Sequence, residues 1–267
     1  MLRNLASEPR VVHVQQRILA SRFARELRKK VPRDHRETDA AFHHRRRVVT
    51  GVSVVGAGLL GTSLSTKPGS KEFYVLTLAV ASTWFAGAVA SGPLHLGYEE
   101  NDSEALRRPF VTPVITGVAA FGFFYGCALV CRRVPILNTA IMNVLEFADH
   151  GSPPLVVSTT FANGAAEEVF FRGALYAAVG TQQPVAKSTA IYALATTTTR
   201  NPALVLASAF MGTIFALQRR STGGIQAPLL THLTWSALML RFMPPLFRSE
   251  KHGKVVSDDT RQGVALP

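Results

Sequence analysis

The chain is poor in charged residues and in cysteine. Only 17% of its 267 residues are charged, and its two cysteines, Cys127 and Cys131, are too few for a disulfide scaffold or a thiolate zinc site. Acidic residues are fewer than basic ones, 17 against 29, and apolar residues make up 47% of the chain. This composition excludes an acidic disordered protein and favours a membrane protein with a separate basic segment.

Much of the positive charge lies near the N-terminus. Residues 1–47 contain 13 of the 29 Lys and Arg residues but no apolar run of 7–15 residues, so we do not expect a secretory signal. Basic residues beside a first membrane span are retained on the cytoplasmic side, which predicts a basic cytoplasmic N-terminal segment. No known or aromatic-interleaved nucleic-acid motif accompanies the charge, so no nucleic-acid partner is expected.

Long apolar stretches fill most of the remaining chain. A spanning helix needs about 20 mostly apolar residues to cross a hydrocarbon core of about 30 Å. The alternation of period two that marks a membrane barrel does not run long enough here. We predict an all-α, polytopic transmembrane helical bundle of about seven or eight helices, in contact with the lipid bilayer of the cell membrane. The expected helices are 48–66, 73–91, 110–131, 136–147, 155–179, 185–199, 203–217 and 225–242.

One expected helix, 155–179, carries charges near its middle. It contains Glu167, Glu168 and Arg172, and each such charge costs roughly 2.5–3.5 kcal/mol at the bilayer centre. Glu168 and Arg172 are four residues apart and can form an ion pair on a helix, whereas Glu167 has no local cation. An unpaired carboxylate in a partly dry site suits general acid–base chemistry. An ion-paired packing cluster between helices would also explain these charges.

A single histidine, His232, lies within the last apolar stretch. A lone membrane histidine is often simply hydrogen-bonded between helices, but two glutamates in a nearby helix favour a shared site. Glu167, Glu168 and His232 would supply two carboxylates and one imidazole to a divalent metal such as zinc, which is an incomplete set. The HExxH signature of zinc proteases is absent, which favours direct activation of water by glutamate.

The pattern Glu167-Glu168-x-x-x-Arg172 resembles the first motif of the CPBP family of intramembrane proteases. This family comprises CAAX proteases and bacteriocin-processing enzymes and is also called the Abi family. The resemblance covers roughly Leu155–Met243 and implies an endopeptidase whose glutamate activates water, helped by the histidine of a Phe-x-x-x-His motif. A second histidine and an asparagine, from His-x-x-x-Asn, would stabilise the oxyanion.

The two later motifs depart from the family pattern. The third corresponds to His232-x-x-x-Ser236, with serine in place of asparagine, and the second to Phe215-x-x-x-Arg219, with arginine in place of histidine. Arginine cannot act as a base at neutral pH. The resemblance implies that Glu167 deprotonates water, that His232 and Ser236 hold the oxyanion, and that Arg172 holds Glu168. The expected catalytic residues are therefore Glu167, Glu168, Arg172, His232 and Ser236.

The predicted function is an intramembrane endopeptidase that cleaves membrane-associated peptide or protein substrates. The arginine at position 219 supports an alternative, a degenerate family member that binds membrane proteins or peptides without cutting them. Intramembrane carboxylates also occur in transporters and proton relays, but no inverted repeat favours that function. The predicted parts of the chain are the basic segment 1–47, transmembrane helices in 48–149, a CPBP-like protease core in 150–245 and a polar tail in 246–267.

Overall fold

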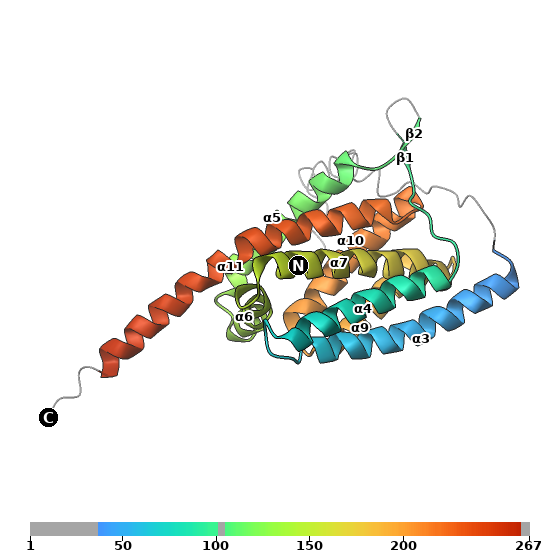
Figure 1. Cartoon of the computed structure of the whole chain (residues 1–267). Helices are drawn as coiled ribbons and strands as arrows, with labels where there is room; N and C mark the ends of the chain where they lie inside the picture. The colour runs from blue at the N-terminus through green and yellow to red at the C-terminus, as the bar shows by residue number, and fades with distance from the viewer. Residues whose placement is uncertain (1–36, 101–104, 263–267) are drawn as a thin grey trace, which may run out of the picture.

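The computed structural model describes residues 37–100 and 105–262, with side chains described as far as residue 247. The part of the basic N-terminal segment before residue 37 lies outside the described residues. Helices make up most of the described chain, and its strands form one two-stranded antiparallel hairpin, which confirms the predicted all-α class (Figure 1). The hairpin consists of β1 (Glu99–Glu100) and β2 (Leu106–Arg107), with Glu99 opposite Arg107.

The helices follow the predicted order of apolar stretches. In chain order they are α3 (Asp39–Ser63), α4 (Lys71–Ala90), α5 (Val111–Cys131), α6 (Pro135–Asp149), α7 (Pro153–Glu167), the π-helix η2 (Glu168–Leu175), α8 (Tyr176–Ala178), α9 (Pro184–Thr196), the 3₁₀-helix η3 (Thr197–Thr199), α10 (Pro202–Thr222) and α11 (Gln226–Gln262). Helix α4 packs between α3 and α7, whereas α11 packs on α5, α7 and α10 (Figure 1). The central α7–η2 segment is thereby enclosed by helices from both halves of the chain.

The first helix begins earlier than its apolar run. Thr38 caps α3, because its hydroxyl accepts a hydrogen bond of 3.2 Å from the Ala41 N–H, and the helix continues from there into the apolar residues. Arg45, which belongs to the predicted basic segment 1–47, is buried. It forms an ion pair with Glu37 and donates to the Ser91 hydroxyl at 3.1 Å. The predicted limit at residue 47 thus falls inside a packed helix.

Two other predicted helices differ from their observed forms. The stretch 155–179 changes from α- to π-helix at Glu168, where the hydrogen-bond step lengthens to five residues; the Tyr176 N–H, for example, bonds to the Phe171 carbonyl. Helix α11 does not end near residue 242 but continues to Gln262, with Pro244 and Pro245 inside it. Hydropathy marks the end of an apolar span, and a polar segment can continue the same helix.

The outer surface of the bundle is rich in large apolar side chains. Val54, Val75, Ile136 and Leu194 are each more than 60% exposed, an arrangement that water would oppose and lipid would favour. Among the described residues, α4, α5 and α10 are long and apolar enough to cross a membrane. The fold is therefore that of an all-α membrane protein.

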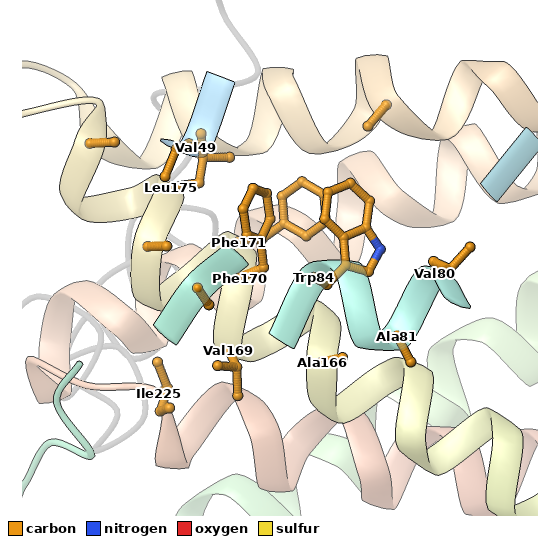
Figure 2. Packing of buried hydrophobic residues seen from close by; sticks show 14 residues of the cluster. Val49, Val80, Ala81, Trp84, Ala166, Val169, Phe170, Phe171, Leu175 and Ile225 are labelled. Carbon is orange, nitrogen blue, oxygen red and sulfur yellow. The ribbon is translucent and has the colours of Figure 1, made fainter. Parts of the chain in front are cut away.

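The largest apolar cluster joins α3, α4 and η2 around Trp84 (Figure 2). The Trp84 ring is fully buried and lies 4.7 Å from the ring of Phe170 and 5.0 Å from that of Phe171, measured between ring centroids. Gly56 of α3 faces the indole so closely that a Cβ there would overlap it. This cluster holds the residues that directly follow Glu167 and Glu168 in place.

Removing the indole should leave a cavity directly behind η2. We expect Trp84→Ala to lower the free energy of unfolding by about 3–5 kcal/mol, as measured by thermal unfolding in detergent. Phe85→Ala on the same helix is the matched control, because Phe85 is 55% exposed on the outer surface. Equal loss of stability in the two variants would contradict the central role of this cluster.

Candidate active site

The change from α- to π-helix occurs between the two glutamates. Glu167 is the last residue of α7, and Glu168 is the first residue of η2. Both side chains are buried, Glu168 completely. The wider π-turn lets two adjacent carboxylates enter the bundle interior with separate sets of partners, and π-helical segments occur frequently at functional sites.

Glu168 is held by two cationic or ionisable groups through the same oxygen. Its Oε1 accepts from Arg172 Nη1 at 3.2 Å, as the spacing of four residues predicts, and lies 2.8 Å from Nδ1 of His232. Arg172 is also almost completely buried. The ion pair therefore offsets the cost of two buried charges and links η2 to α11.

Aromatic rings order this cluster further. The Arg172 guanidinium lies 4.5 Å from the ring centroid of Tyr192 and 4.9 Å from that of Phe215. The other partner of Phe215 is the imidazole of His232, stacked on it at 5.0 Å with an angle of 18° between the planes. Side chains from η2, α9, α10 and α11 thus form one stack, in which cation–π attraction stabilises the buried guanidinium.

Glu167 has a different set of partners. Its Oε1 accepts a hydrogen bond of 2.7 Å from Asn163 Nδ2, and its Oε2 accepts one of 2.8 Å from the Tyr192 hydroxyl. Asn163 lies one turn earlier on α7, whereas Tyr192 comes from α9. The carboxylate is therefore held by two neutral donors, while the Arg172 cation is bound to Glu168.

His232 presents its second ring nitrogen to the same region. Because Nδ1 contacts Glu168, Nε2 is directed toward α7, where a Cβ at Gly164 would lie only 3.3 Å from it. The absence of a side chain at Gly164 thus lets α7 lie close to the imidazole. Ser236 lies one turn later on α11 and is buried, but among the described residues no hydrogen bond joins it to Glu167, Glu168 or His232.

The side chains considered for a metal are not arranged as a metal site. Within the described residues, no group of three His, Cys, Asp or Glu side chains could hold a metal ion. Both oxygens of Glu167 accept hydrogen bonds from neutral donors, and Glu168 is engaged with Arg172. Glu167, Glu168 and His232 therefore do not fit a metal ion in this arrangement.

The Arg219 side chain is not directed at Glu167, as the histidine of the Phe-x-x-x-His motif would be. Its side chain is buried, its Nε donates to the backbone carbonyl of Arg172 at 2.8 Å, and its guanidinium lies 5.3 Å from the ring centroid of Tyr176. No described contact joins it to the Glu167 carboxylate. Arg219 instead satisfies a carbonyl of the π-helix, which makes it part of the packing behind the site.

Residues 150–238 match the family model "Type II CAAX prenyl endopeptidase Rce1-like". This match covers about a third of the chain and supports membership of the CPBP family. The matched region runs from the end of α6 into α11 and includes the glutamate pair, Arg172 and His232. No curated protein and no solved structure matches the chain. The match makes residues 150–238 protease-like, and the buried cluster within them is the candidate active site.

Tyr192 and Asn163 are the site residues that the sequence patterns did not single out. Tyr192 begins an aromatic-x-x-x-polar spacing, Tyr192-x-x-x-Thr196, on the helix that directly follows the glutamate pair. The same spacing occurs at Phe215-x-x-x-Arg219 on α10, so spacing alone does not tell which helix faces Glu167. Asn163 could have been recognised because it lies four residues before Glu167.

Glu168→Gln should destabilise the protein strongly, because it leaves the Arg172 guanidinium buried without a compensating charge. Removing one partner of a buried pair costs about 3–5 kcal/mol, and we expect a loss of this size in thermal unfolding in detergent. Glu99→Gln is the matched control, since its partner Arg107 is 48% exposed and keeps its contact with solvent. An unchanged midpoint in Glu168→Gln would mean that the pair contributes nothing.

Arg219→Met should also lower stability, because the Arg172 carbonyl loses a donor inside the bundle. A hydrogen bond to a charged group contributes about 1.5–3 kcal/mol, and thermal unfolding should detect a loss in this range. Arg46→Met, at an exposed position of α3, should leave the unfolding midpoint nearly unchanged. Arg219→His should not raise activity, since the side chain does not face Glu167; a gain would contradict this placement.

Proposed function

We propose that this protein is a multi-pass endopeptidase of the cell membrane that cleaves membrane-associated peptides or proteins. The observation that carries the proposal is the Glu167 carboxylate, buried within a lipid-facing bundle and held by neutral donors instead of the nearby Arg172 cation. A carboxylate bound in this way keeps lone pairs with which it can accept a proton from water. The match of residues 150–238 to a protease family supports the same chemistry.

In the proposed reaction, water beside Glu167 gives a proton to the carboxylate as its oxygen attacks the carbonyl carbon of the scissile amide. The carbonyl oxygen becomes negatively charged in the tetrahedral intermediate. The proton on Glu167 then passes to the amide nitrogen, the C–N bond breaks, and an amine and a carboxylic acid are released. One water molecule is consumed in each cycle.

We assign the oxyanion to His232 and Ser236. The imidazole is oriented by Nδ1, which contacts Glu168, so that Nε2 lies beside Gly164 on α7. With a proton on Nε2, the ring would donate to the oxyanion, and hydrogen-bond donors that are fixed in advance lower the barrier most. Glu168 would act by positioning this ring, and Arg172 by positioning Glu168.

We also propose that the predicted division of the chain reflects this function. Residues 150–245 would form the protease core, and the helices of 48–149 would complete the bundle around it. The basic segment 1–47 would remain in the cytoplasm, as would the polar tail 246–267. The substrate would reach the site from the bilayer, because large apolar side chains cover the outer surface of the bundle.

Glu167→Gln should abolish cleavage while leaving the fold intact, because an amide fills the same space but cannot take up a proton. The measurement is turnover of a quenched fluorescent transmembrane peptide by purified protein, and removal of a general base should lower it by about 10²–10⁴-fold. Glu72→Gln, at an exposed position in the first turn of α4, is the control and should cleave normally.

The outcomes separate the competing functions. Activity retained in folded Glu167→Gln would remove Glu167 from the mechanism. No cleavage by folded wild-type protein, together with binding of the same peptide, would favour the non-catalytic member of the family.

A further inference from the structure

The Tyr192 hydroxyl approaches Glu167 from another helix. It donates to Oε2 at 2.8 Å, while Asn163 donates to Oε1, so each carboxylate oxygen accepts one hydrogen bond. A carboxylate oxygen has about two lone-pair sites, and one donor leaves a second site available. The two donors therefore fix the plane of the carboxylate without blocking it.

The tyrosine ring is itself fixed on several sides. Its centroid lies 4.6 Å from that of Phe171, and the Arg172 guanidinium lies over one face at 4.5 Å. Gly212 of α10 borders the ring, since a Cβ there would lie 3.1 Å from Tyr192 Cδ1. The hydroxyl is thus pre-organised by packing from η2 and α10 before any substrate is present.

The Tyr192 hydroxyl makes a contact that a phenylalanine at this position could not make. Phenylalanine could make the same contacts with Phe171 and Gly212, and its ring would also attract the guanidinium of Arg172. The hydroxyl adds a partly buried polar group, which is costly unless it is bonded, and its partner here is Glu167. The ionisable groups around that carboxylate are Glu168 and Arg172 from η2, Tyr192 from α9 and His232 from α11.

We propose that Tyr192 is the positioning residue for the general base of this protein. It holds the Glu167 carboxylate at the angle from which Oε2 accepts a proton from water, through a hydrogen bond across α7 and α9. In this role a phenol assists Glu167, whereas the family pattern implies the histidine of the Phe-x-x-x-His motif, and Arg219 is not needed for it. The inference rests on the proposed peptidase function of Glu167.

The test is Tyr192→Phe, which removes one oxygen and keeps the ring. We expect kcat for the transmembrane reporter peptide to fall about tenfold to a hundredfold, because a small misplacement of a reacting group costs up to about 10²-fold. KM should stay within about twofold, since the hydroxyl acts on the base and not on substrate binding. Tyr125→Phe on α5 is the matched control, because its ring packs on Phe121 outside the cluster.

The results distinguish this proposal from the function on which it rests. A low kcat with unchanged KM, and an unfolding midpoint equal to that of Tyr125→Phe, would support the positioning role. Wild-type rates in Tyr192→Phe would overturn it while leaving the peptidase function in place. A parallel loss of activity and thermal stability would also overturn it, since it would make the hydroxyl merely structural. Wild-type protein that does not cleave would overturn both.

Discussion

Burial of the Glu168 carboxylate is the constraint that determines how the core helices meet. A fully buried carboxylate must be compensated, and Arg172 and His232 both contact its Oε1. Arg172 in turn lies between the rings of Tyr192 and Phe215, and His232 stacks on Phe215. Compensation of the Glu168 charge therefore fixes α9, α10 and α11 against η2. It also pairs the Arg172 guanidinium with Glu168 instead of Glu167.

The sequence predicted most helices because hydropathy changes sharply at their ends. Helices α4 and α5 match uncharged apolar stretches almost to the residue, since polar loops flank them on both sides. The predicted helix bounds and helix types were wrong where they depend on hydrogen bonds or on polar residues instead of hydropathy. The start of α3 is set by a side-chain hydrogen bond from its cap, and η2 is set by a longer hydrogen-bond step. Helix α11 continues into a polar segment that hydropathy does not mark as helical.

The candidate site was predictable where its contacts are local or carried by a motif. The spacing of Glu168 and Arg172 predicts their ion pair, and the family pattern brings His232 to the same site. Tyr192 is a different case, because its bond to Glu167 joins residues 25 positions apart and depends on the rotation of α9. Arg219 shows the converse, because a residue at a motif-like spacing can face the backbone behind the site instead of the site itself.

The length of α11 has a consequence for the end of the chain. Its 37 residues extend about 55 Å at 1.5 Å per residue, whereas the hydrocarbon layer is only about 30 Å thick. At a tilt of about 40° a helix of this length still spans more than the hydrocarbon layer. Figure 1 shows the C-terminal part of α11 extending beyond the other helices. The element that carries His232 within the bundle therefore also carries the polar sequence up to Gln262 beyond the other helices.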